Sequence, residues 1–165
     1  MANRLGDPPN RDWADVLFAK AGLYGVQRRY QDAVDVYDQL IPYRRETQGP
    51  ESTSFLGTLH GYGMILARMG RWDEALTVYE EVAAGYRPIL GDGTWQMARV
   101  DADLAQAQAW TAYLNGEPLA PDRRADVRGR LTAWADTLEA RYGTSERMYG
   151  QAMDAVAVFD SLYGS

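Results

Sequence analysis

The chain has no cysteine among its 165 residues and a single histidine, His60. The lack of cysteine excludes disulfide bonds, thiolate metal sites and a cysteine nucleophile. One histidine is too few for a histidine-rich metal site, and the sequence contains no phosphate-binding loop or hydrolase motif. We therefore expect no metal, no cofactor and no catalytic residue, and we do not expect an enzyme.

Long apolar runs and a basic face are also missing. No run approaches the ~20 apolar residues that span a membrane, and the first ten residues are polar and lack the apolar core of a secretory signal. The net charge is −6, and the sixteen arginines are scattered, as a GC-rich gene would produce. These features predict a cytoplasmic protein without a membrane or nucleic-acid partner.

The sequence does contain an internal repeat with a period of 42 residues. Arg28–Tyr37 reads RRYQDAVDVY, and Gly70–Tyr79 reads GRWDEALTVY, which aligns with it without a gap. The match extends to the preceding segment, since residues 13, 17, 21 and 24 recur as 55, 59, 63 and 66. A repeat of this length is typical of stacked helical hairpins.

Helix signals recur with the same period. The second helix of each repeat has apolar residues at i, i+3, i+4, i+7 and i+8, which are Ala33, Val36, Tyr37, Leu40 and Ile41 and then Ala75, Val78, Tyr79, Val82 and Ala83. Ser52 or Thr53 can cap a helix, and Gly70 can turn the chain. We expect Pro88 and the Gly91–Gly93 loop to end the fourth helix.

A third hairpin is predicted from Thr94, with its first helix ending at Asn115-Gly116. Its register is open: 46 residues place Gly116 on Gly70, whereas 45 place Leu104 on Leu59. The last two helices each have an apolar face, formed by Val127, Leu131, Trp134, Ala135, Leu138 and Tyr142 and by Met148, Ala152, Ala155, Val156, Phe159 and Tyr163.

These patterns predict an all-α fold, a right-handed solenoid of about seven helices with two to three repeats and C-terminal capping helices. We expect a flexible leader over residues 1–11 and one domain over 12–165. Within the domain we expect repeat 1 at 12–49, repeat 2 at 50–92, a degenerate repeat 3 at 93–142 and a capping helix at 143–165.

At the repeat positions the chain resembles the tetratricopeptide repeat family, with a large residue, a small one and another large one on the first helix and a small residue and an aromatic on the second. The first repeat supplies Leu17, Ala21, Tyr24, Ala33 and Tyr37, and the second Leu59, Gly63, Leu66, Ala75 and Tyr79. The 42-residue period and Leu90-Gly91 are similar to the long variant of kinesin light chains and many bacterial regulators. The resemblance implies binding and no shared catalytic residue.

In that family the first helix of each hairpin lines a concave surface. Carried over by position, and with the 46-residue register for the third repeat, the binding candidates are Asp15, Phe18, His60, Met64, Arg68, Asp103, Gln106, Trp110 and Tyr113. An arginine, a histidine and aromatic rings facing one groove are suited to a peptide with an acidic group or a C-terminal carboxylate. The alternative for Trp110 and Tyr113 is a packing role beneath the last helices.

We therefore expect a small bacterial adaptor or regulator that binds a protein segment or peptide. Two alternatives stay open. One is a self-association module, such as a homodimer, formed through Trp13, Phe18 or the Val156–Tyr163 helix. The other is a small-molecule-binding or enzymatic pocket, favoured by the five tryptophans and eleven tyrosines.

Overall fold

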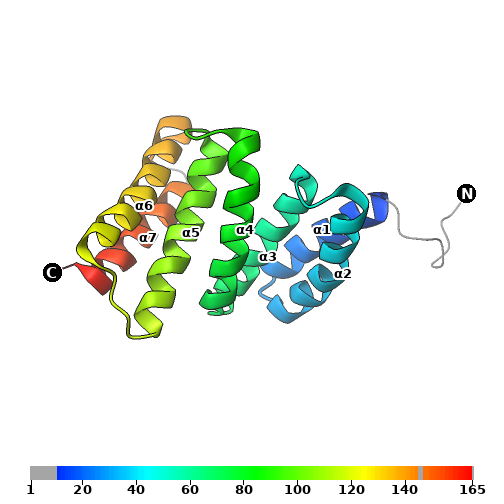
Figure 1. Ribbon diagram of the computed structural model, residues 1–165, viewed down its shortest axis with the longest axis horizontal. Coiled ribbons are helices and arrows are strands. Elements are labelled where there is room, and N and C mark those ends of the chain that lie inside the picture. Colours follow the sequence, from blue (N-terminus) through cyan, green and yellow to red (C-terminus); the bar gives the residue numbers. More distant parts are fainter. Residues whose placement is uncertain (1–10, 145–146, 165) are drawn as a thin grey trace, which may run out of the picture.

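The computed structural model describes residues 11–144 and 147–164, and these residues form seven α-helices and no strand. Each helix packs against the next along the chain, and Figure 1 shows them side by side in chain order. The prediction of an all-α hairpin solenoid with about seven helices is confirmed. The helices are α1 (Arg11–Val26), α2 (Tyr30–Gln48), α3 (Thr53–Arg68), α4 (Trp72–Leu90), α5 (Trp95–Leu114), α6 (Pro121–Tyr142) and α7 (Arg147–Tyr163).

The leader predicted over residues 1–11 lies outside the described residues, except for its last residue. Helix α1 begins at Arg11, one residue before the predicted start of the domain.

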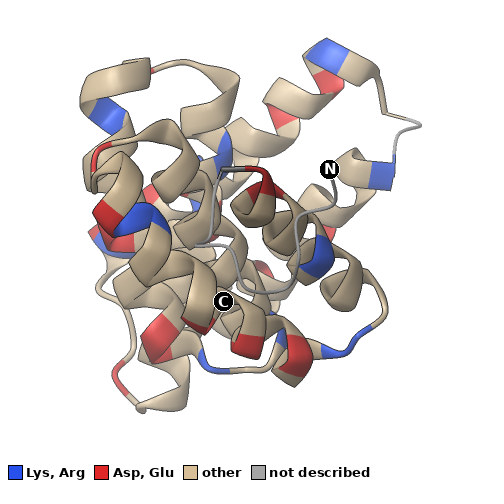
Figure 2. Cartoon of the chain, turned by 90° about the vertical axis from the view of Figure 1, so that its right-hand side faces the viewer, with Lys and Arg blue, Asp and Glu red and all other residues tan. Residues whose placement is uncertain are grey.

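The 42-residue period is visible in the backbone as well as in the sequence. The Ser52 hydroxyl accepts a hydrogen bond from the backbone N–H of Phe55, and 42 residues later the Thr94 hydroxyl accepts one from Met97. Each capped helix, α3 or α5, therefore starts at the same place in its repeat. Viewed from the N-terminal end, charged residues of both signs are dispersed over the helices (Figure 2).

The third hairpin follows two registers because α5 contains an extra turn. The N-caps of α3 and α5 are 42 residues apart, whereas the left-handed residues after these helices, Gly70 and Gly116, are 46 apart. Helix α3 has 16 residues and α5 has 20, and four residues make about one helical turn. The 46-residue register thus holds at the end of α5, and a 42-residue register holds at its start.

Three details differ from the sequence prediction. Pro88 does not end α4, which continues to Leu90 and stops before Gly91 in the left-handed region at φ 73°. A proline in the last turn removes one hydrogen bond without preventing the turn from closing. Tyr142 and Met148 were expected on apolar inner faces, but they are 46% and 43% exposed, because each lies in a terminal turn that no neighbouring helix covers.

The core runs between successive helices and repeats its large residues. Tyr37 of α2 and Tyr79 of α4 occupy equivalent positions and are 3% and 2% exposed. Gly63 of α3 leaves room for the second ring, since a Cβ at Gly63 would lie 2.7 Å from the Tyr79 ring. Burial raises the pKa of Tyr37 to about 12 and raises the pKa of Tyr79 as well.

Candidate functional site

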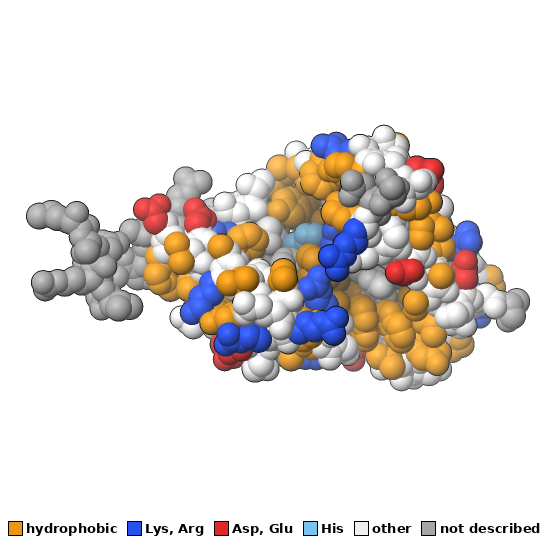
Figure 3. All heavy atoms as spheres, turned by 180° about the vertical axis from the view of Figure 1, so that it is seen from behind, with side chains coloured by type: hydrophobic (Ala, Val, Ile, Leu, Met, Phe, Trp, Pro, Cys, Tyr) orange, Lys and Arg blue, Asp and Glu red, His pale blue; other side chains and the backbone are white. Residues whose placement is uncertain are grey.

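One face of the solenoid is hollowed, and the single histidine of the chain lies within the hollow, among hydrophobic and arginine side chains (Figure 3). Here α3 and α5 are joined by polar side chains. His60 Nε2 lies 2.8 Å from Asp103 Oδ2, and Arg99 Nε donates to the same oxygen over 2.8 Å. The Arg99 Nη2 atom also lies 3.7 Å from the sulfur of Met64. We call this site, with Gln106, the α3–α5 groove.

Helical spacing explains why these side chains share one face. His60 and Met64 are four residues apart on α3, and Arg99, Asp103 and Gln106 follow at intervals of four and three on α5. Residues at these intervals lie above one another on a helix. Because the two caps start α3 and α5 in step, the two rows of side chains meet halfway along the helices.

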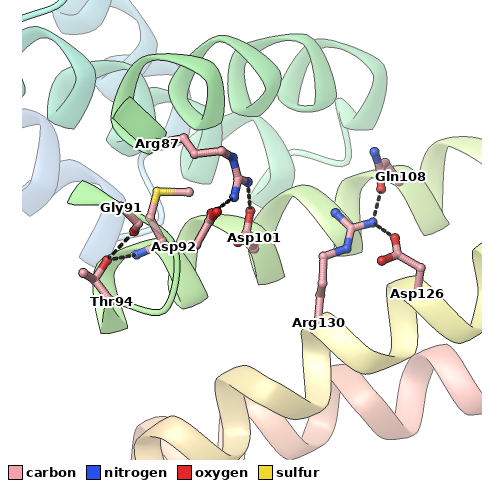
Figure 4. A network of polar contacts seen from close by, with 9 residues as sticks. Arg87, Gly91, Asp92, Thr94, Asp101, Gln108, Asp126 and Arg130 are labelled. Atoms are coloured by element: carbon pink, nitrogen blue, oxygen red, sulfur yellow. Dashed lines mark hydrogen bonds and ion pairs between the residues drawn. The ribbon is translucent and has the colours of Figure 1, made fainter. Parts of the chain in front are cut away.

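Helix α5 is held from both sides by arginines of its neighbours (Figure 4). Arg87, near the end of α4, donates to Asp101 of α5 over 2.7 Å and also binds Asp92 in the connecting loop. Arg130 of α6 donates to the Gln108 side chain of α5 over 2.7 Å. These bonds fix α5 between α4 and α6, so the groove side chains project from a rigid support.

The centre of the groove is a nearly buried carboxylate with two donors. The side chains of Asp103, His60 and Arg99 are 17%, 20% and 29% exposed. Burial would raise the pKa of Asp103, but the hydrogen bond from His60 and the charge of Arg99 outweigh burial and hold that pKa below its usual value. An ionised carboxylate only accepts hydrogen bonds, so the proton in the contact with His60 is on Nε2.

Two hollows lie on either side of Arg99, which lines both. The smaller, about 170 Å³, lies between α5, α6 and α7 and is lined also by Asp103, Gln106 and Trp134. The larger, about 310 Å³, lies between α3, α4 and α5 and is lined by residues that include His60, Tyr86 and Trp95. Aromatic rings support the cations here, with the Arg99 guanidinium 5.6 Å from the Trp134 ring. The groove therefore offers cationic donors beside apolar hollows.

Comparison with protein families gives one match: residues 13–87 match the model of the tetratricopeptide repeat family. Residues 13–87 are tetratricopeptide repeats. Among solved structures, the chain is similar to a putative kinesin light chain of Podosopora anserina with nearly identical TPR-like repeats, and to a single-substitution variant of that protein. Each comparison has a TM-score of 0.64 and 16% identity, and covers 93% of this chain and 68% of the other. No curated protein matches the chain.

The tetratricopeptide architecture brings together four of the residues that the sequence nominated for binding, His60, Met64, Asp103 and Gln106. Two lie on the first helix of the second hairpin and two on the first helix of the third. They meet through Arg99, which contacts Met64 and Asp103 directly. Their binding role stays a prediction.

Asp15 and Phe18 lie at a different junction of the tetratricopeptide repeats, where α1, α2 and α3 meet. Asp15 accepts a hydrogen bond of 2.6 Å from the buried Arg44, whose guanidinium carbon lies 5.2 Å from the centre of the Phe18 ring. Phe18 also lies against Gly61, next to His60 in the sequence. Phe18 thus reaches the N-terminal side of the groove, whereas Asp15 neutralises Arg44.

The other three candidates lie away from His60. Arg68 is at the end of α3, where its Nη1 donates to the Gly25 carbonyl over 3.4 Å. The Trp110 ring stacks on Trp72 of α4, with centroids 5.5 Å apart and planes 11° apart. Tyr113 is 50% exposed and lines a separate hollow near the end of α7. Packing explains Trp110 well, although its partner is a residue of α4.

Sequence reasoning missed Arg99, Trp95 and Trp134. A signal for Arg99 was present, because it precedes Asp103 by four residues and Gln106 by seven on the same helical face. Trp134 was assigned to a core face and is indeed 8% exposed, yet its ring also borders the groove beside Arg99. No sequence signal assigned Trp95 to the larger hollow.

Two further kinds of site are missing from the described part of the chain. Within the described ranges, no group of three histidine or acidic side chains is arranged to hold a metal ion. Among the helices that the structure describes, none is long and apolar enough to cross a bilayer.

Proposed function

We propose that the chain is an adaptor without catalytic activity of its own, which binds an extended segment of a protein or a peptide in the α3–α5 groove. Tetratricopeptide repeats generally mediate protein interactions. The observation that carries the proposal is the shared carboxylate of Asp103, which holds His60 and Arg99 side by side between two hollows.

The charge of the groove favours an acidic group on the bound segment. Arg99 uses Nε for Asp103, and its Nη atoms have no carboxylate partner among the described residues. His60 uses Nε2 for the same carboxylate, so two basic side chains share one acid. A ligand carboxylate would find charge-assisted donors here, and its neighbouring apolar side chains would fit the hollows lined by Trp95 or Trp134.

The groove is also formed before any ligand binds. Its side chains lie on helices, and Asp103 and Trp134 already orient Arg99. A preformed site loses little conformational entropy on binding, which favours affinity for a short flexible segment.

The test is selection of peptides from a displayed random library with the full chain, followed by calorimetric titration. The informative variant is Arg99→Met, which retains an aliphatic stem over Trp134 and removes the cation. The matched control is Arg45→Met, which removes a surface arginine paired with Glu81 outside the groove. We expect selected peptides to be acidic and to bind Arg99→Met at least about tenfold more weakly, about 1.4 kcal/mol, with no change for Arg45→Met.

Equal affinity for the wild type and Arg99→Met, with both chains fully helical, would remove the groove assignment. Selection of a small molecule from a metabolite mixture, with no peptide selected, would support the pocket alternative instead.

A further inference from the structure

Helix α1 is apolar on two opposite faces. Ala14, Ala21 and Gly25 are buried against the rest of the molecule, as expected. On the opposite face a second stripe is exposed, with Val16 at 66%, Leu23 at 54% and Val26 at 79% exposure, and Ala19 between them. Residues 16, 19, 23 and 26 recur at intervals of three and four, so they form one continuous line. We call this line the α1 outer stripe.

The later repeats show what normally covers this position. Val16 and Leu23 correspond, 42 residues later, to Thr58 and Ile65 of α3, which are 0% and 4% exposed. Thr58 binds Arg44 of α2, and Ile65 belongs to a core cluster with residues of α2.

Helix α5 repeats the arrangement. Val100 and Ala107, a further 42 residues along, are 2% and 0% exposed and pack with residues of α4. In both later hairpins, therefore, the second helix of the preceding hairpin covers this line. Helix α1 has no such helix in the described structure, and its stripe nevertheless retains the apolar residues of a covered position.

We propose that the α1 outer stripe binds the same stripe of a second copy of this chain, with the two α1 helices antiparallel about a twofold axis at the level of Ala21. This pairing places Val16 against Val26 of the second copy and Ala19 against Leu23. Large side chains then face large ones at the ends, and a small residue faces a leucine near the centre. Gly22, where a Cβ would have no neighbour within 4 Å, leaves room for the Lys20 stem of the other copy.

Charge also favours the antiparallel pairing. The helix begins with Asp12 and is followed by Arg28, and neither side chain forms an ion pair within the described residues. The antiparallel arrangement brings the acidic end of one helix to the basic end of the other, and it also opposes the two helix dipoles favourably. A parallel pairing would place like charges together.

The interface is small, since it uses one helix face from each copy. Interfaces below about 1,200 Å² in total area belong to weak complexes. We therefore expect a dimer that forms reversibly as the chain concentration rises. The α3–α5 groove lies on another face of the solenoid, so the proposal does not depend on the proposed function.

The first experiment is sedimentation equilibrium of the full chain over a wide concentration range. Leu23→Glu is expected to weaken self-association at least about tenfold, because the charge is buried twice in a twofold dimer. The matched control is Val158→Glu, which adds the same charge at an exposed valine of α7 (39% exposed) and should leave the dimer intact. A wild-type chain that stays monomeric, or a dimer broken by Val158→Glu and not by Leu23→Glu, would overturn the proposal.

The second experiment uses the absence of cysteine to test the orientation. Chains with Ala19→Cys and chains with Leu23→Cys are oxidised separately and as an equimolar mixture. The antiparallel dimer predicts efficient disulfide formation only in the mixture. A parallel dimer would instead cross-link each variant with itself. No enrichment in any sample would show that this stripe is not the interface.

Discussion

Arg44 of α2 and Tyr86 of α4 occupy equivalent positions in successive hairpins, 42 residues apart, yet they leave very different surroundings. Arg44 is 4% exposed and donates to Asp15 over 2.6 Å, to Thr58 over 2.8 Å and to the Ser54 carbonyl over 3.0 Å. Its guanidinium lies over Phe18 and fills the space between three helices.

In the second hairpin that space is open. Tyr86 makes one hydrogen bond, to the Thr53 carbonyl over 3.1 Å, and Gly57 replaces Asp15 beside it. His60 stands where the first hairpin has Phe18. Tyr86 and His60 line the hollow of about 310 Å³ beside Arg99. One backbone thus gives a filled junction in the first repeat and an open one in the second, and the difference results from three side-chain positions.

The largest expected effect comes from emptying the filled junction. Arg44→Ala removes a buried side chain and its three hydrogen-bond partners, so the free energy of unfolding should fall by about 3 kcal/mol. Tyr86→Ala removes a partly buried ring with one hydrogen bond and should cost about half as much. Urea denaturation followed by circular dichroism measures both. Equal costs for the two substitutions would contradict the comparison.

A smaller effect concerns Tyr37 and Tyr79, where the two repeats are alike. Burial raises the folded-state pKa of each phenol above the usual value of 10.0. The unfolded chain ionises first as pH rises, so stability is complete below pH 10 and falls above it, by about 1.4 kcal/mol per pH unit for each tyrosine. For Tyr37 this loss continues to about pH 12.

Denaturation at a series of alkaline pH values tests this expectation. Tyr37→Phe and Tyr79→Phe should each flatten the decline, whereas Tyr142→Phe, at a 46% exposed position, should leave it unchanged. An identical decline in all four chains would show that these two phenols do not govern alkaline stability.

The smallest effect concerns the turn between the helices of each hairpin. Arg28 has φ 60°, and the equivalent Gly70 has φ 76°. A residue with a side chain is strained in the left-handed region, so Arg28→Gly should stabilise the chain by about 1 kcal/mol and Gly70→Ala should destabilise it by a similar amount. Thermal melts of both variants give the sign directly, and a loss of stability in Arg28→Gly would count against an equivalent turn.

Local signals were sufficient to predict most of the fold. Ser52, Thr94 and Gly70 act through their nearest neighbours in the chain, so their caps and turn could be inferred from residue type. The 42-residue match then gave the pairing of helices. Pro88 misled because its position within the last turn, rather than its type, decided whether α4 continued.

The candidate site was harder to predict because it depends on contacts between helices. Asp103 and His60 could be placed on first helices, but their contact depends on the start of α5, which the extra turn obscured. Arg44 gave no sign of burial, since its partners Asp15 and Thr58 come from two other helices. The stacking of Trp110 on Trp72 is likewise set by how α4 and α5 pack.

The central claim is that a peptide binds where the second repeat is open. The most direct measurement is nuclear magnetic resonance of the isotope-labelled chain, titrated with a peptide selected from the displayed library. The account predicts the largest amide shifts in α3 and α5, around His60, Arg99 and Asp103, with little change around Arg44. Shifts centred on the junction of α1 and α2, or on the outer face of α7, would contradict it.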